Sequence, residues 1–221
     1  MYFSASLAGN TRFHCLGTAV ATNPAGPYTP NSQQFTCPTG NGGAIDASGY
    51  KDSDGSRWVV YKIDGNNIGN GGLCNNGNPP LKPTPILIQR VSGNGYTTQG
   101  SPTQILDRDN NDGPLVEAPS LSKINGRYVL WFSSNCYSTT LYDVTFAVSN
   151  TINGLYAKRG PMLVTGRLGL SAPGGAEVTP DGKFMAFHAG PVGARYMYTA
   201  RVTASGDTIT ICTNAGCQSA S

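Results

Sequence analysis

Charged residues are scarce in this chain of 221 residues: Asp, Glu, Lys and Arg make up 12%, against roughly 25% in a typical soluble domain. The formal net charge is only +3 at pH 7, and the 15 Lys and Arg residues form no run. A nucleic-acid-binding protein needs a basic stripe or patch, so no nucleic-acid partner is expected. No apolar stretch approaches the roughly 18 to 20 residues of a membrane-spanning helix, so no membrane partner is expected either.

Histidine is rarer still, with two residues in the chain, and none of the six cysteines forms a C-x-x-C pair. The common zinc sites need such pairs or several histidines, so no metal site is predicted. An even number of cysteines in a chain low in charge favours disulfides and an oxidising compartment. Buried free thiols are the alternative. Proximity in the sequence predicts the pairs Cys15–Cys37 and Cys212–Cys217, which leaves Cys74–Cys136.

Glycine and proline, in contrast, are abundant, with 29 and 15 residues. Asp-Gly and Asn-Gly turns, which favour hairpins, precede strands rich in aromatic and branched residues at 54–62, 125–133 and 181–188. A strand followed by a turn that closes on Tyr recurs at 16–28 and 143–156. The longest stretch free of Gly and Pro, 127–153, is rich in Val, Tyr, Phe and Thr, which favour strands over helix.

Repeats of roughly 50 to 70 residues made of short strands are typical of propeller blades, although a β-sandwich is an alternative. No linker between domains is visible, since the Gly/Asn-rich stretch 66–80 lies inside one repeat. The chain opens at Met1 as if inside a strand, without the charged and apolar regions of a signal peptide. We therefore predict that residues 1–221 form one all-β domain, an incomplete propeller that lacks most of its first blade.

Two glutamates, Glu117 and Glu177, accompany ten aspartates. Glycoside hydrolysis needs a carboxylic acid that protonates the leaving group and a second carboxylate, and the acid keeps its proton in an apolar, partly desolvated site. Glu117 lies in such a segment, 113–119, which contains two prolines; a strand-end glutamate that points into water is the alternative. Asp46 stands at the entry to a strand, where Asp is disfavoured, or else caps a turn.

Other polar and aromatic residues carry weaker signals. His188 ends an aromatic strand and is either a substrate ligand or, more commonly for such a residue, a packed histidine. Trp58 and Trp131 are candidates for binding glycans through their aromatic faces. Three nearby aspartates lack the glycine and distal glutamate of an EF-hand calcium loop and are interpreted as a solvated loop: Asp107, Asp109 and Asp112.

Taken together, these segments resemble glycoside hydrolase family 43, whose members are five-bladed β-propellers that act on arabinan, arabinoxylan and related plant polysaccharides. Three segments carry the resemblance by their order and spacing: Gly43-Ala44-Ile45-Asp46-Ala47 with Asp54-Gly55, Val116-Glu117-Ala118-Pro119 with Asn125-Gly126, and Pro173-Gly174-Gly175-Ala176 with Phe187-His188-Ala189. The last of these resembles the last blade of the family. The resemblance implies that Glu117 is the general acid and that Asp46 modulates the pKa of this acid and orients it.

The resemblance also implies an inverting mechanism, with the acid and a general base roughly 6.5 to 9.5 Å apart. The family's base is an aspartate near the start of the first blade, and no residue here occupies that position. This chain is therefore expected to be weak or inactive by itself. Many members carry a histidine where this chain has Gly174-Gly175, which argues against a centrally bound calcium ion, and no other cofactor is expected.

The expected protein is a secreted monomer whose partner is an oligosaccharide or polysaccharide. The alternative is a propeller that binds glycans through Trp58, Trp131 and His188 without cleaving them. Which sugar and which linkage are recognised depends on loops that the resemblance does not determine.

Overall fold

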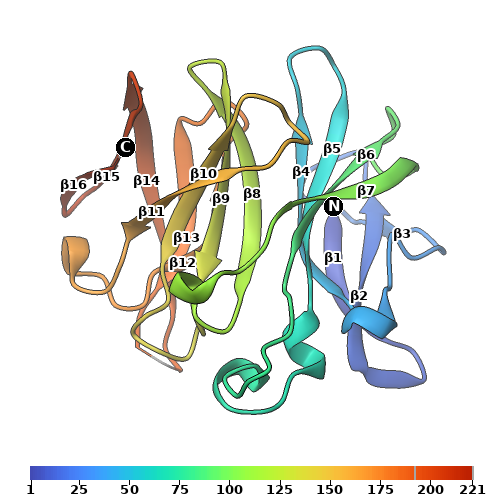
Figure 1. Cartoon of the computed structure of the whole chain (residues 1–221). Helices are drawn as coiled ribbons and strands as arrows, with labels where there is room; N and C mark the ends of the chain where they lie inside the picture. Colours follow the sequence, from blue (N-terminus) through green and yellow to red (C-terminus); the bar gives the residue numbers. More distant parts are fainter. Residues whose placement is uncertain (192, 221) are drawn as a thin grey trace.

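The computed structural model of the chain describes residues 1–191 and 193–220. Within this part, sixteen strands form four antiparallel sheets that succeed one another along the chain (Figure 1). The sheets lie in a row, with the first sheet at one end and the last at the other, and they do not close into a ring. The all-β prediction is confirmed.

Each sheet consists of strands that are consecutive in the sequence. The first contains β1 (Tyr2–Leu7), β2 (Asn10–Val20) and β3 (Thr29–Pro30), and the second contains β4 (Ala44–Lys51), β5 (Arg57–Ile63), β6 (Ile86–Val91) and β7 (Thr98–Leu106). The third contains β8 (Val116–Ile124), β9 (Arg127–Ser134), β10 (Val144–Ser149) and β11 (Ala157–Leu163). The fourth contains β12 (Gly174–Val178), β13 (Phe184–Ala189), β14 (Tyr196–Ser205), β15 (Thr208–Thr213) and β16 (Gly216–Ala220). Short 3₁₀ helices lie in the connections: η1 (Thr39–Asn41), η2 (Gly65–Ile68), η3 (Leu73–Asn75), η4 (Asn110–Asp112) and η5 (Arg167–Gly169).

The three predicted turn-and-strand repeats form the first hairpins of the second, third and fourth sheets. Their turns contain Gly55, Gly126 and Gly182, with φ angles of 86°, 81° and 67°. Glycine adopts these left-handed angles without the steric cost that a Cβ atom brings. The same local chemistry therefore starts three sheets in succession.

Three hydrophobic cores fill the spaces between successive sheets. The core between the first and second sheets includes Leu16, Val59 and Tyr61. The next is built from residues of the second and third sheets, and the last joins the third and fourth. Sheet thus packs on sheet, as successive blades do in a propeller.

The apolar residues of β9 follow one another without alternating polar residues because both faces of the strand are buried. Val129 and Trp131 belong to the core on the side of the fourth sheet, whereas Leu130 and Phe132 belong to the core on the side of the second sheet. Successive side chains of a strand point to opposite faces, and here both faces are buried. The alternation of polar and apolar residues is therefore absent, as it is in strands covered on both sides.

The three disulfides have the pairing predicted from the sequence: Cys15–Cys37, Cys74–Cys136 and Cys212–Cys217. The Cys74–Cys136 bond joins the long connection after β5 to the loop after β9 and thereby ties the second sheet to the third. In the described part of the chain, no helix has the length and hydropathy needed to cross a membrane.

The interpretation of residues 107–112 as a solvated loop is wrong for Asp112, which is buried. Asp109 and Asp112 form a capping box at the start of η4. Lys158 from β11 contacts both carboxylates. These charges are therefore used to cap a helix and to tie it to the edge of the third sheet.

Replacing Leu130, which has no exposed surface, by alanine is expected to lower the free energy of unfolding by about 2 to 5 kcal/mol, because a cavity forms between the second and third sheets. The matched control is Leu155→Ala, since the Leu155 side chain is 84% exposed and its loss is expected to cost less than about 0.5 kcal/mol. Urea unfolding of both variants measures the difference. Equal losses would contradict the packing described for β9.

Candidate active site

The first strands of the second, third and fourth sheets, β4, β8 and β12, lie next to one another. In each sheet, the pairing of this first strand with the second strand contains a register shift near the start of the first strand. The bulge contains a residue with positive φ in each case: 60° at Asp46, 51° at Ala118 and 61° at Gly175. Positive φ is uncommon for residues with a Cβ atom, and bulges occur often beside active sites, where they re-aim side chains. The three irregularities meet at one point.

A cavity of about 370 Å³ opens at this point. It is lined by Asp46, Glu117, Ala118, Tyr137, Tyr142, Gly175 and His188. The structure thus brings together three residues that the sequence analysis singled out at separate places: Asp46, Glu117 and His188. A larger hollow of about 740 Å³ is lined mainly by residues of β12 to β15, and its lining contains one carboxylate, Glu177, and no partner acid.

Glu117 is sheltered and held at both oxygens. Its side chain is 15% exposed. The hydroxyl of Tyr142 donates a hydrogen bond of 2.7 Å to Oε1, and the ammonium of Lys62 lies 3.3 Å from Oε2. The orientation of the carboxyl group is therefore determined by donors from two other elements, the loop before β10 and strand β5.

Asp46 is tied to the backbone directly after Glu117. The amide of Ala118 donates a hydrogen bond of 3.0 Å to Asp46 Oδ2. Burial raises the pKa of Asp46 to about 6, and the negative charge of Glu117 adds to this effect, while Lys62 and the Ala118 amide oppose it. The carboxylate pair therefore spans the junction between the second and third sheets.

His188, Tyr142 and Arg195 form a packed group on the other side of the cavity. The rings of Tyr142 and His188 are stacked with centroids 6.0 Å apart, and the Arg195 guanidinium lies 5.4 Å from the Tyr142 ring centroid. Arg195 Nε donates to His188 Nδ1, which places the proton of a neutral imidazole on Nε2. Burial, followed by the charge of Arg195, lowers the pKa of His188.

Gly174 and Gly175 make room for this group. A Cβ atom at Gly174 would lie 1.9 Å from the Tyr142 ring, and one at Gly175 would lie 2.4 Å from His188 Nε2. Any side chain at either position would therefore displace a residue of the cavity. The adjacent glycines are needed because two rings from neighbouring elements approach the backbone of β12.

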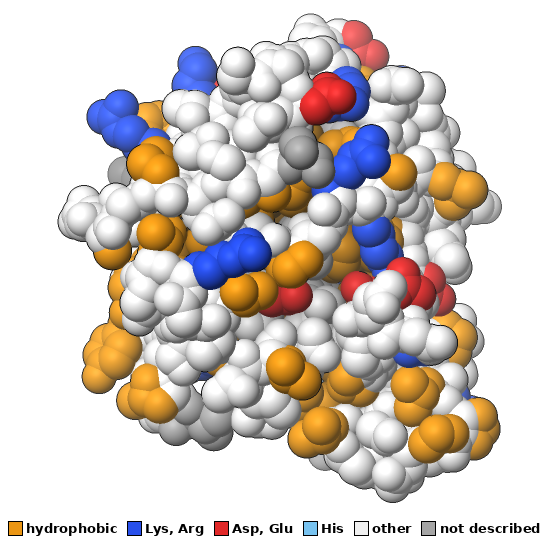
Figure 2. Space-filling view, turned by 60° about the vertical axis from the view of Figure 1, so that its left-hand side comes forward, with side chains coloured by type: hydrophobic (Ala, Val, Ile, Leu, Met, Phe, Trp, Pro, Cys, Tyr) orange, Lys and Arg blue, Asp and Glu red, His pale blue; other side chains and the backbone are white. Residues whose placement is uncertain are grey.

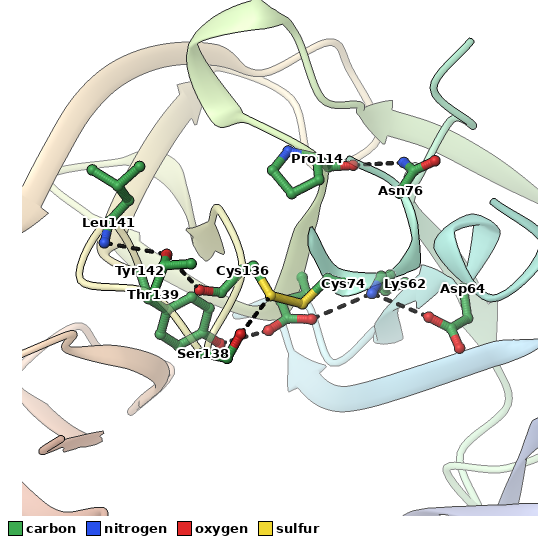
Figure 3. The surroundings of a disulfide bond; sticks show 11 residues. Lys62, Asp64, Cys74, Asn76, Pro114, Cys136, Ser138, Thr139, Leu141 and Tyr142 are labelled. Atoms are coloured by element: carbon green, nitrogen blue, oxygen red, sulfur yellow. Dashed lines mark hydrogen bonds and ion pairs between the residues drawn. A yellow bond between two sulfur atoms is a disulfide. The ribbon is translucent and has the colours of Figure 1, made fainter. Parts of the chain in front are cut away.

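The loop that carries Tyr142 is held by the Cys74–Cys136 disulfide (Figure 3). Figure 3 shows this disulfide beside Lys62 and Tyr142, with Lys62 directed toward Asp64. Thr139 donates to the carbonyl of Cys136 and accepts from the amide of Leu141. The cross-link thus positions the donor to Glu117 as well as stabilising the fold.

Lys62 and Tyr142 are site residues that were not predicted from the sequence. Lys62 had a signal, because it stands between Tyr61 and Ile63 in a strand whose last five residues are buried. A lysine at such a place is rare unless it is paired. Tyr142 had no comparable signal, since its role comes from the approach of the loop before β10 to β8.

The two tryptophans do not belong to the cavity. Trp131 has no exposed surface and donates from Nε1 to Ser122, so its predicted contact with a glycan is wrong: the ring is core packing. Trp58 lies near the start of β5, about 13 Å along the strand from Lys62 at the usual rise, where Arg90 covers its ring.

A centrally bound metal does not fit the residues present. Gly175 stands in the segment where many family members are expected to carry a histidine, and the space above it is used by His188 Nε2. That imidazole is held through its other nitrogen by the cation Arg195. The described residues contain no group of three or more His, Cys, Asp or Glu side chains arranged to hold a metal ion.

Solved structures define the class of fold. A thermostable family-43 glycoside hydrolase superposes with a TM-score of 0.78 at 23% identity, covering 96% of this chain and 70% of that one. An endo-1,4-beta-xylanase from Bacteroides thetaiotaomicron gives 0.71 at 23% identity, with 96% and 70% covered. An endo-arabinase from the same organism gives 0.69 at 20% identity, with 92% and 71% covered. The predicted propeller architecture is confirmed.

The sequence itself assigns the family. Residues 1–206 match the profile of glycosyl hydrolases family 43, and the chain belongs to this family. Among curated proteins no match to the chain was found.

Replacing Asp46 by asparagine is expected to stabilise the fold increasingly as the pH rises from about 4 to 6. The pKa of Asp46 is raised to about 6 in the folded protein, so the native state binds more protons than the unfolded state in this range, and stability falls as pH rises. The asparagine side chain cannot ionise, and its oxygen can still accept from the Ala118 amide. We expect a gain of about 1 to 2 kcal/mol above pH 6.

Urea unfolding at several pH values measures this difference. The control is Asp54→Asn, because hydrogen bonds from Ser56 lower the pKa of the exposed Asp54. Its carboxylate stabilises the folded state above the unfolded pKa, so the pH dependence has the opposite sign. A pH-independent effect of Asp46→Asn would contradict the burial of an ionisable carboxyl group at this site.

Proposed function

We propose that this chain provides the general acid of an inverting glycosidase that acts on plant cell-wall polysaccharide such as arabinan or arabinoxylan. The observation that carries the proposal is the position of Glu117. It is a sheltered carboxyl group at a cavity, held by Tyr142 and Lys62, with Asp46 bound to the next residue. Paired carboxyl groups in different environments are typical of glycoside hydrolysis.

In the proposed reaction, Glu117 donates its proton to the glycosidic oxygen as the bond from that oxygen to the anomeric carbon breaks. The leaving sugar departs as an alcohol. Water attacks the anomeric carbon from the opposite face and gives its proton to a general base, which inverts the configuration. Asp46 acts as the positioning carboxylate, because its oxygen is already engaged with the Ala118 amide.

Among the described residues, the acidic lining of the cavity consists of Asp46 and Glu117. These two have other roles in the proposed mechanism, so no residue of the lining is assigned as the general base. Acid–base assistance is typically worth about 10²- to 10⁴-fold in rate. We therefore expect this chain to hydrolyse glycosides more slowly, by a factor in this range, than an enzyme whose cavity also contains a general base.

A neutral, polar substrate agrees with the surface of the molecule. Charged side chains are few on the face drawn in Figure 2, and much of the surface is neither charged nor hydrophobic. The similar solved structures include an endo-xylanase, an endo-arabinase and a Xanthomonas citri enzyme complexed with xylotriose. Three disulfides support action outside the cell, since such bonds persist in oxidising compartments.

Replacing Glu117 by glutamine is expected to lower kcat on arabino- or xylo-oligosaccharides by about 10²- to 10⁴-fold, because the amide cannot supply a proton. The other glutamate provides the control: Glu177→Gln, outside the cavity lining, is expected to retain activity. Reducing-sugar release by the intact protein measures both. Full activity of the Glu117 variant would remove this residue from the mechanism.

A glycan-binding role without hydrolysis is the second candidate, favoured by the absence of a base among the cavity residues described. Tyr137 is 54% exposed and lines the cavity, so its ring is available to a sugar. Tyr137→Ala is expected to weaken oligosaccharide binding about 3- to 10-fold, whereas Trp58→Ala is expected to leave it unchanged. Titration calorimetry measures both; binding with no hydrolysis by the intact protein supports this second role.

A further inference from the structure

Lys62 is a buried cation beside the proposed acid. It lies on β5, paired with Ile45 of β4, and its side chain is 1% exposed. Its ammonium contacts Glu117 Oε2 at 3.3 Å and Asp64 Oδ1 at 3.2 Å. Removing an ammonium group from water costs on the order of several kcal/mol, so a lysine is placed here only because carboxylates surround it.

The ammonium keeps its charge in this site. Burial lowers the pKa of Lys62, but the attraction of Glu117, Asp64 and Asp46 outweighs it, and the pKa is raised. Lys62 is therefore a permanent positive charge. One cation stands among three carboxyl groups, so any change at Lys62 alters the balance of charge at all of them.

The two oxygens of Glu117 have different surroundings. Tyr142, which donates to Oε1, belongs to the cavity lining. Lys62, which contacts Oε2, does not belong to it. Oε2 is therefore directed to a buried cation, whereas Oε1 is bound by a residue of the cavity lining.

We propose that Lys62 is a positioning residue of the reaction: it holds the inner oxygen of Glu117, leaves the other oxygen to the substrate and places a positive charge against this carboxyl group. The inference rests on the proposed role of Glu117 as the acid. Asp46 and Lys62 then act in opposite senses, since a neighbouring negative charge favours the protonated acid and a neighbouring positive charge favours the carboxylate.

Several other charged or titratable groups face Glu117 from the elements around it. They are Asp46 from β4, Asp64 from the end of β5, Tyr142 from the loop before β10 and His188 from β13, with Arg195 behind the imidazole. Of the two cations, Arg195 donates to His188 and to the carbonyl of Ala172. Lys62 is the cation in contact with the carboxylate among these groups.

The composition of the chain allows a direct test. There are two glutamates, Glu117 and Glu177, so protein labelled with ¹³C at the glutamate carboxyl carbon gives two side-chain signals, assigned by Glu117→Gln. The midpoint of the Glu117 titration is then followed in the parent, in Lys62→Met and in Lys62→Arg. Glu177, which accepts a hydrogen bond from Ser48, is the internal control.

Loss of the ammonium leaves Asp46 and Asp64 unopposed, so the Glu117 midpoint in Lys62→Met is expected to rise by at least about one pH unit. Arginine restores the charge, and Lys62→Arg is expected to titrate near the parent value. A midpoint in Lys62→Met within about 0.3 pH unit of the parent, equivalent to about 0.4 kcal/mol, overturns the proposal.

Lys62→Met also removes the cation that Asp64 and Glu117 share, which can prevent folding. In that case the comparison is between Asp64→Asn and the double variant with Lys62→Met added, because the double variant removes both charges of one ion pair. The double variant is expected to titrate at higher pH than Asp64→Asn alone. Equal midpoints overturn the proposal.

Kinetics of the intact protein separate this inference from the proposed function. The alkaline limb of the pH profile of kcat/KM is expected to move to higher pH in Lys62→Met and to return in Lys62→Arg. If Glu117→Gln stays active, the proposed function fails even when the Glu117 signal responds to Lys62. If Glu117→Gln is inactive and the Glu117 midpoint is unchanged in Lys62→Met, only the proposed role of Lys62 is overturned.

Discussion

The hydrogen bond from the Ala118 amide to Asp46 joins two sheets at the point where the proposed acid stands. Both residues have positive φ, so each strand leaves its regular pleat there. A regular strand would carry the backbone amide into a ladder bond with its own neighbour. The bulges free one amide of the third sheet for a carboxylate of the second, and Glu117, which Tyr142 and Lys62 contact, directly precedes that amide.

Charged side chains are concentrated at the site, although they are few in the chain as a whole. Only 12% of residues are charged, yet Lys62, Asp64, Asp46 and Glu117 meet where the second sheet adjoins the third. Burying these groups costs free energy that a purely structural core would not incur. The Cys74–Cys136 bond and the cores on either side of the third sheet stabilise the frame that holds them.

Some features were predictable because their cause is local. Asp-Gly and Asn-Gly turns at 54–55, 125–126 and 181–182 start hairpins, and the disulfide pairs followed from their spacing. The apolar segments around Asp46 and Glu117 left a solvent-facing or turn-capping role open, and the resemblance to family 43 indicated their place in the site. Trp131 and Asp112 were assigned wrongly because local sequence does not distinguish the alternatives. An aromatic residue in a strand has the same sequence neighbours whether it faces a core or a sugar. An aspartate in a polar loop likewise has the same neighbours whether it is solvated or caps a helix.

The sequence by itself determined the all-β class, the hairpins and the cysteine pairing, since these depend on neighbours along the chain. Its resemblance to family 43 also pointed to three residues that line the cavity, Asp46, Glu117 and His188. The tertiary structure alone decided that the bulges of β4, β8 and β12 lie close together. It also decided that Lys62 and Tyr142 bind the two oxygens of Glu117. Finally, it decided that Gly174 and Gly175 leave room for the rings of Tyr142 and His188. These contacts join residues from separate sheets and loops, and only the packing of one sheet on the next brings them within reach.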